Sequence, residues 1–185
     1  MPIRCFVSVD IEDPSVMSKV ESLQRELLLT HADLRLVNPK SIHLTLLFLG
    51  EVEETVAKGI CGVLRGKELS PKKVRLEGLG LFPSASRPNV VWIGIASGAE
   101  ELNAAACRVA SLLKPFGFSP DEKGFQAHVT IARVRSGRNK DRLLEKVREL
   151  GRVQVGEVST SPVRLKKSTL TPVGPIYETL CEAVP

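Results

Sequence analysis

Two short segments of the chain share one pattern, and this repeat constrains the fold more than any other feature. Residues 42–46 read Ile-His-Leu-Thr-Leu, and residues 127–131 read Ala-His-Val-Thr-Ile. Both alternate apolar and polar side chains, which is typical of a strand with one buried face. In each, the histidine and the threonine share the other face. Two such strands, about 85 residues apart, predict two similar lobes whose polar faces meet in a central cleft.

The residue types in the repeat suit a displacement at phosphorus. A neutral imidazole can take a proton from the attacking group while an imidazolium opposite protonates the leaving oxygen. We therefore predict that His43 and His128 form a catalytic pair. The hydroxyls of Thr45 and Thr130 would donate hydrogen bonds to phosphate oxygens. Arg133 would bind the same phosphate, but simple alternation places it opposite His128, so it would need the strand end or a bulge to reach the cleft.

The remaining candidate ligands give little reason to expect a metal or a cofactor. His31 follows a helical pattern and is expected to interact with the helix dipole. A three-histidine metal site that includes His31 is the alternative, but no carboxylate stands near it to complete such a site. Four cysteines occur without any C-x-x-C pair, and we expect separate, reduced thiols that pack as small apolar side chains. They are Cys5, Cys61, Cys107 and Cys181.

Apolar periodicity predicts an α+β fold. The helices are expected from Pro14, behind an Asp13 cap, to Leu28, and at residues 53–64, 100–113 and 140–150. The strands are expected at residues 3–9, 34–37, 42–49, 73–81, 90–96, 127–134, 152–158, 163–170 and 175–181, with Gly50 ending the third of them. Many connections are too short for parallel crossovers, so we expect antiparallel or mixed sheets with helices on one face. Residues 83–88, rich in Pro and Ser, are the candidate junction or mobile rim.

Composition narrows the class of protein. With 43% hydrophobic residues among 185, the chain can form a core, and its net charge of +5 favours an anionic partner. The basic residues gather in the second half, but the helix at 140–150 is expected to be a solvated face rather than an RNA groove. Aromatic residues make up only 4%, so we expect core positions rather than base stacking for Phe48, Phe82, Trp92 and Phe125. No segment resembles a signal peptide or a membrane span, so we expect a cytoplasmic protein without a membrane partner.

The paired motifs resemble the signatures of the 2H phosphoesterase superfamily, and most closely its LigT-like RNA 2′,3′-cyclic phosphodiesterases, also called 2′–5′ RNA ligases. The resemblance rests on residues 41–50, 125–134 and 168–178, with weaker likeness at 4–9 and 87–92. It implies one bilobal domain over residues 1–185. In this fold, two antiparallel sheets related by a pseudo-two-fold axis line a central cleft, and the helices lie outside.

The resemblance also implies an activity, the metal-independent hydrolysis of an RNA 2′,3′-cyclic phosphate to a 2′-phosphomonoester. By this likeness His43 would protonate the leaving 3′ oxygen and His128 would activate water. Thr45, Thr130 and Arg133 would hold the phosphate. Pseudo-symmetry leaves the choice of acid and base open.

The implied partner is RNA with cyclic phosphate ends, tRNA fragments included, and the expected state is a monomer. The family's other reported activity joins RNA ends through a 2′–5′ linkage, and the residues do not decide between the two directions. Two alternatives remain open: an RNA- or nucleotide-binding module without turnover, and a phosphodiesterase for a small cyclic phosphate such as an ADP-ribose derivative.

Overall fold

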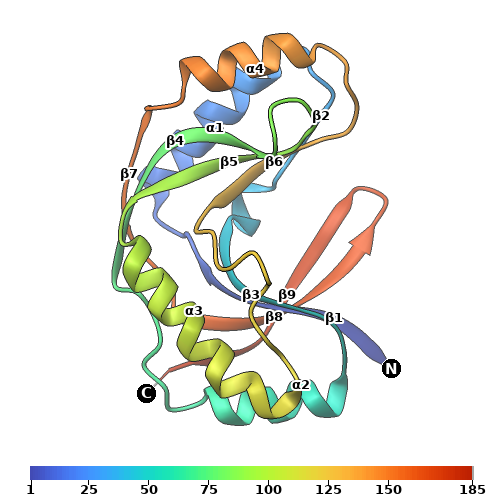
Figure 1. Cartoon of the computed structure of the whole chain (residues 1–185), viewed down its shortest axis with the longest axis vertical. Coiled ribbons are helices and arrows are strands. Elements are labelled where there is room, and N and C mark those ends of the chain that lie inside the picture. The colour runs from blue at the N-terminus through green and yellow to red at the C-terminus, as the bar shows by residue number, and fades with distance from the viewer. Residues whose placement is uncertain (185) are drawn as a thin grey trace.

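The computed structural model describes residues 1–184, which form nine strands, four α-helices and two 3-10 helices (Figure 1). The strands are β1 (Pro2–Asp10), β2 (Leu34–Leu36), β3 (His43–Glu53), β4 (Lys73–Pro83), β5 (Pro88–Ser97), β6 (Val129–Val134), β7 (Gln154–Ser159), β8 (Val163–Thr171) and β9 (Gly174–Ala183). The helices are α1 (Pro14–Leu28), η1 (Pro39–Ser41), α2 (Glu54–Leu64), α3 (Ala99–Leu113), η2 (Lys114–Phe116) and α4 (Lys140–Glu149). Within these residues, no helix has the length and apolar character that a membrane span requires.

The strands form two antiparallel sheets, as expected. One has the order β3-β1-β8-β9 and the other the order β2-β6-β5-β4-β7. In Figure 1 the four-stranded sheet occupies the lower half of the molecule and the five-stranded sheet the upper half. The prediction of an α+β fold built on two antiparallel sheets is confirmed.

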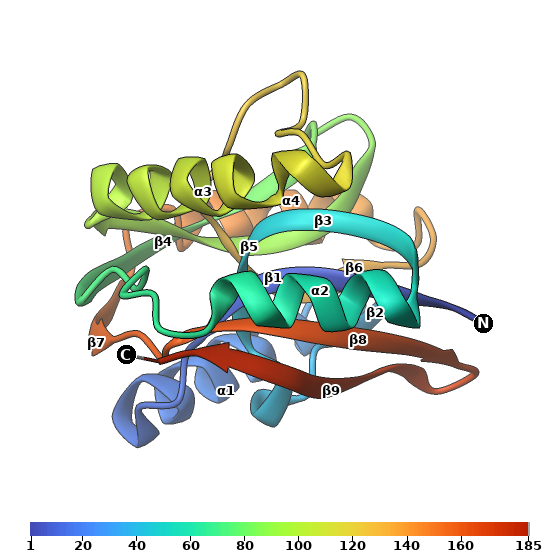
Figure 2. The ribbon, with the colours of Figure 1, turned by 90° about the horizontal axis from the view of Figure 1, so that it is seen from below.

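Two of the helices follow a strand of one sheet and pack against the other sheet. Helix α1 follows β1 of the four-stranded sheet, yet it packs against β6 and β7 of the five-stranded sheet. Helix α3 follows β5 of the five-stranded sheet and packs against β3 of the other. Helix α4 lies against α1 and β4, while α2 crosses the outer side of the four-stranded sheet (Figure 2). Each sheet is therefore covered by a helix whose preceding strand lies in the other sheet.

The start of α1 shows how local sequence determines an element. The Asp13 carboxylate accepts hydrogen bonds from the backbone N–H groups of Ser15, at 2.9 Å, and Val16, at 3.0 Å. Pro14 occupies the first turn, where its missing N–H costs nothing. The helix then buries a stripe of apolar residues, as its spacing predicts.

Some predicted boundaries are wrong. Gly50 does not end β3, which continues to Glu53; Gly50 lies opposite Cys5 beside a register shift and adopts φ +71°, a conformation that glycine tolerates. The strand therefore bends at this position. Residues 83–88 are also no junction between lobes, because they close the β4–β5 hairpin within one sheet. At the second motif, β6 begins at Val129 rather than at residue 127.

The prediction of four separate thiols is wrong for one pair. Cys61 of α2 and Cys181 of β9 form a disulfide, with their Cα atoms 5.8 Å apart. Cys5 and Cys107 are free, the first buried and the second exposed. The pairing depends on how α2 packs against β9, which the spacing of cysteines in the sequence does not reveal.

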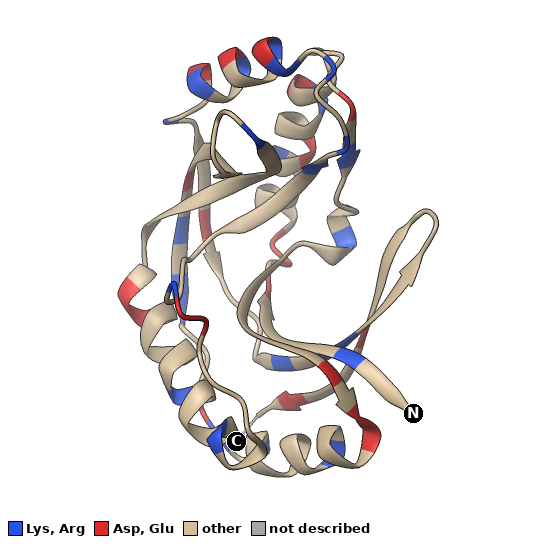
Figure 3. Ribbon diagram, turned by 45° about the vertical axis from the view of Figure 1, so that its right-hand side comes forward, with Lys and Arg blue, Asp and Glu red and all other residues tan. Residues whose placement is uncertain are grey.

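The basic helix α4 has one buried apolar side and a charged remainder. It buries Leu143 and Val147, and residues of both charges alternate along its ribbon (Figure 3). Lys146 pairs with Glu149 at 2.9 Å and lies 3.5 Å from Glu26. This agrees with the expectation of a solvated face.

Candidate active site

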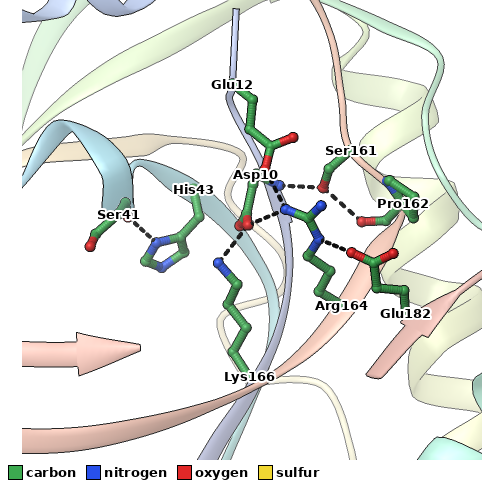
Figure 4. Close-up of polar contacts among 9 residues, drawn as sticks. All are labelled: Asp10, Glu12, Ser41, His43, Ser161, Pro162, Arg164, Lys166 and Glu182. Atoms are coloured by element: carbon green, nitrogen blue, oxygen red, sulfur yellow. Dashed lines mark hydrogen bonds and ion pairs between the residues drawn. The ribbon is translucent and has the colours of Figure 1, made fainter. Parts of the chain in front are cut away.

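The two motif histidines are held in the same way, each by the backbone two residues earlier. Nδ1 of His43 lies 2.7 Å from the carbonyl oxygen of Ser41, and Nδ1 of His128 lies 2.7 Å from that of Gln126 (Figure 4 shows the first contact). A carbonyl oxygen only accepts, so Nδ1 carries the proton in each neutral ring and donates it. Each Nε2 is thereby left with a lone pair that can take up a proton.

Aromatic rings pack around both imidazoles. The ring centre of His43 lies 4.9 Å from that of Phe6 and 5.1 Å from that of Tyr177. The ring of His128 meets Phe82 edge-on at 4.9 Å. Burial lowers the pKa of both histidines below the ordinary value of 6.5, although the hydrogen bond to each carbonyl opposes this effect. Both rings are therefore mainly neutral at pH 7 in the free protein.

A bulge in β6 brings Arg133 to the face of the histidine. Thr130 lies opposite Trp92 and Ala132 opposite Val91, so Ile131 has no partner on β5. Ile131 and Ala132 are both buried as a result, and Arg133 is exposed on the face of Thr130. The positive charge of Arg133 lowers the pKa of both His43 and His128. One guanidinium therefore acts on both halves of the candidate site.

The same bulge occurs in β3, two residues before an aromatic side chain rather than an arginine. Thr45 lies opposite Ser8 and Leu47 opposite Val7, so Leu46 is the unpaired residue. Phe48 consequently holds the position in β3 that Arg133 holds in β6. Its side chain is 71% exposed, so the prediction that Phe48 belongs to the core is wrong.

A cavity of about 510 Å³ lies between the motif strands and α3. Its lining includes two of the predicted site residues, Thr45 and His128, together with three phenylalanines, Phe48, Phe82 and Phe125. His43, Thr130 and Arg133 do not border it and adjoin the lining residues along the motif strands. A second cavity, of about 550 Å³, lies between α2 and the outer side of β8 and β9 and contains none of the predicted residues.

Behind His43 lies a buried group of charges that sequence analysis missed. Oδ2 of Asp10 accepts from Nζ of Lys166 at 2.5 Å and from Nη1 of Arg164 at 2.6 Å (Figure 4). Arg164 also pairs with Glu12 and Glu182. We call these five residues the charge cluster. The side chains of Asp10 and Lys166 are only 9% and 8% exposed.

The charge cluster acts on one histidine. Asp10 lies opposite His43 in the β1–β3 register, and its negative charge raises the pKa of His43, while Lys166 lowers it. Neither charge has a resolved effect on His128. The sequence signal that could have revealed the cluster is a pair of basic residues, Arg164 and Lys166, that alternate with the apolar Val163 and Leu165 at the start of a strand. Asp10 stands at the end of another strand.

His31 does not join the motif histidines. It lies in the turn after α1 with φ +56°, and its carbonyl oxygen accepts from the side chains of Arg138 and Asn139 beside α4. Within residues 1–184, no group of three or more His, Cys, Asp or Glu side chains is arranged to hold a metal ion. The three-histidine alternative therefore finds no support in the geometry.

Two antiparallel sheets that each present a His-x-Thr motif define the class of protein as a 2H phosphoesterase. The family described as LigT like phosphoesterase matches residues 9–92 and again residues 93–177, so each match contains one motif. The chain belongs to this LigT-like phosphoesterase family.

Similar proteins carry names that agree with this family. An RNA 2′,3′-cyclic phosphodiesterase of Aeropyrum pernix is 40% identical over 90% of this chain and 95% of its own length. One of Archaeoglobus fulgidus is 40% identical over 96% of this chain and 98% of its own. The crystal structure of E. coli LigT complexed with 3′-AMP matches with a TM-score of 0.72 at 19% identity, over 97% of this chain and 96% of that one, which shows the shared fold.

Proposed function

We propose that this chain is an RNA 2′,3′-cyclic phosphodiesterase that opens the cyclic phosphate to a 2′-phosphomonoester without a metal ion. The observation that carries the proposal is the matched pair of imidazoles, each with Nδ1 tied to a carbonyl and Nε2 free. The name shared by relatives at 40% identity supports the same substrate.

In the proposed reaction, Nε2 of His128 takes a proton from water as the water oxygen attacks phosphorus. The bond from phosphorus to the 3′ oxygen breaks, and the Nε2 proton of a charged His43 goes to that oxygen. His128 borders the open cavity, where water can enter. The charges around His43 do not by themselves favour its protonated form, because Lys166 lowers its pKa more than Asp10 raises it. The access of water therefore supports His128 as the base, which leaves His43 as the acid.

The phosphate would be held by the groups that follow each histidine. The hydroxyls of Thr45 and Thr130 would donate hydrogen bonds to its oxygens, and Arg133 would stabilise the negative charge that develops in the transition state. The exposed ring of Phe48, at the matching position of the other strand, offers a surface for the terminal base. After the bulge, β6 would thus stabilise the charge of the phosphate through Arg133, and β3 would contact the nucleoside through Phe48.

The same proposal implies a partner, an oligomeric state, a location and a second reaction. The partners would be RNA ends that carry cyclic phosphates, tRNA fragments among them, and the enzyme would act as a monomer in the cytoplasm. Ligation through a 2′–5′ linkage would need a 5′-hydroxyl in place of water at the same two histidines.

The deciding experiment is incubation of a short RNA ending in a 2′,3′-cyclic phosphate with the protein in EDTA, followed by identification of the product phosphate. We expect a 2′-phosphate from the wild type and none from His43→Ala or His128→Ala. His31→Asn is the matched control, because asparagine tolerates the positive φ at that turn. Activity that survives both motif changes would overturn the mechanism. Binding without turnover would favour the binding module, and turnover of only a small cyclic phosphate would favour the other alternative.

A further inference from the structure

A second arginine stands beside Arg133 on the cleft face. Arg35 of the short strand β2 lies directly opposite Arg133 in the β2–β6 register. Directly paired residues of antiparallel strands point to the same face, with Cα atoms about 4.5–5.5 Å apart. Like charges in this arrangement repel each other. An anion between or beside the two guanidinium groups would offset this repulsion.

No carboxylate within residues 1–184 forms an ion pair with either guanidinium. Arg135, just after β6, differs, because it lies 3.9 Å from Asp33. Arg35 and Arg133 thus carry positive charge that no carboxylate of the described residues offsets. This is what a site for an anionic ligand requires.

Arg35 also connects the two sheets. Its Nη2 lies 3.5 Å from the carbonyl oxygen of Pro172, at the turn of the β8–β9 hairpin, which belongs to the other sheet. Gly174 of the same turn lies beside this side chain, since a Cβ there would be in ordinary van der Waals contact, at 3.9 Å, with Cδ of Arg35. The hairpin projects from the rest of the molecule (Figure 1), and Tyr177 on its second strand packs against His43.

We propose that Arg35 and the turn of the β8–β9 hairpin form a second phosphate subsite, which binds the internucleotide phosphodiester on the 5′ side of the terminal nucleotide. The inference rests on the proposed function, in which Arg133 holds the reacting phosphate. The next phosphate of an RNA chain lies one nucleotide away, and Arg35 lies one strand further from the histidines. A mononucleotide has no second phosphate, so the subsite would select an RNA chain over a free cyclic nucleotide.

The test uses binding of reaction products, so it does not depend on turnover. The ligands are adenosine 2′-phosphate, the dinucleotide ApA with a 2′-phosphate, and the same dinucleotide with an uncharged methylphosphonate linkage. The proteins are the wild type, Arg35→Ala, Arg35→Lys and Arg148→Ala. Arg148 is exposed on α4, outside the cleft, so its change removes the same charge elsewhere.

We expect Arg35→Ala to weaken binding of the charged dinucleotide about tenfold. Its affinity for adenosine 2′-phosphate and for the methylphosphonate ligand should equal that of the wild type. The wild type should in turn bind the methylphosphonate about tenfold more weakly than the charged dinucleotide, and Arg35→Lys should lie between. Loss of one phosphate contact should reduce the slope of log affinity against log salt by about 0.7.

Three results would overturn the subsite. They are an equal loss of affinity for all three ligands in Arg35→Ala, no loss of affinity for any of them in that variant, or the same loss of affinity in Arg148→Ala. If Arg35→Ala does not fold, the comparison of charged and uncharged linkages in the wild type decides alone. Failure of the proposed function gives a different result: the wild type would hydrolyse neither the cyclic mononucleotide nor the cyclic dinucleotide, whatever the binding data show.

Discussion

The two motif strands, β3 and β6, share their backbone geometry and differ in their surroundings. In each motif, Nδ1 of the histidine lies 2.7 Å from a carbonyl oxygen two residues earlier, and each strand has a bulge after its threonine. Yet β3 is an edge strand backed by the charge cluster, whereas β6 lies between β2 and β5. After the bulge, β3 presents Phe48 and β6 presents Arg133.

This difference shows how a duplicated unit can serve two roles. The features that aim each imidazole lie in the backbone and are the same in both halves, so both rings can transfer protons. The features that would separate the proposed acid from the proposed base are side chains: Asp10 and Lys166 change the pKa of His43 alone, while Arg133 lowers that of both rings. The proposed roles of the two histidines therefore depend on residues outside the repeated motif.

The largest expected effect tests what the halves have in common. His43→Ala and His128→Ala should each lower kcat by about 10²–10⁴-fold, because each removes one proton transfer. Single-turnover rates on an RNA 2′,3′-cyclic phosphate measure this, with unchanged circular dichroism as evidence of folding. If one variant keeps near wild-type rates, the two rings do not act as a pair.

The next effect tests how the halves differ. Arg133→Ala should lower kcat by about 10²–10³-fold, because Arg133 would stabilise charge in the transition state. Phe48→Ala should mainly raise KM, about tenfold, since stacking of one base contributes about 1–3 kcal/mol. Steady-state kinetics on the same RNA separate the two parameters. The proposal that Arg133 stabilises charge while Phe48 only binds the base would be refuted if Phe48→Ala lowered kcat as strongly as Arg133→Ala.

Much of this site could be predicted from the sequence, because the alternation of the motifs places each histidine and threonine on one strand face. Alternation alone does not predict the position of Arg133, because that position depends on a bulge in β6. A bulge has only a faint signal, the paired apolar residues Leu46-Leu47 and Ile131-Ala132 where alternation predicts one polar side chain. The partners of Arg35 and Asp10 lie on distant strands, so they follow from register and tertiary packing rather than from any local pattern.

A smaller effect would identify the acid. Lys166→Met removes a buried cation that lowers the pKa of His43, so that pKa should rise. If His43 is the acid, it must be protonated, and the alkaline limb of the kcat/KM profile should move to higher pH while the acidic limb stays. If His43 is the base, the acidic limb should move instead. Lys167→Met is the matched control, because Lys167 lines the cavity on the outer side of the sheet.

The smallest effect on catalysis is expected from the disulfide, which lies in the lobe of β3 and has no counterpart among the described cysteines of the other lobe. Cys61 and Cys181 are 120 residues apart, so their bond restricts a long loop of the unfolded chain. Replacing both with serine should lower the free energy of unfolding by about 3 kcal/mol, since disulfides typically contribute about 2–4 kcal/mol. Rates should stay within about twofold, because the bond joins α2 to the outer side of the sheet, away from the histidines. Urea unfolding with and without reductant measures the effect. The serine variant should not respond to reductant, and a wild type that is equally unresponsive would mean that the bond does not stabilise this lobe.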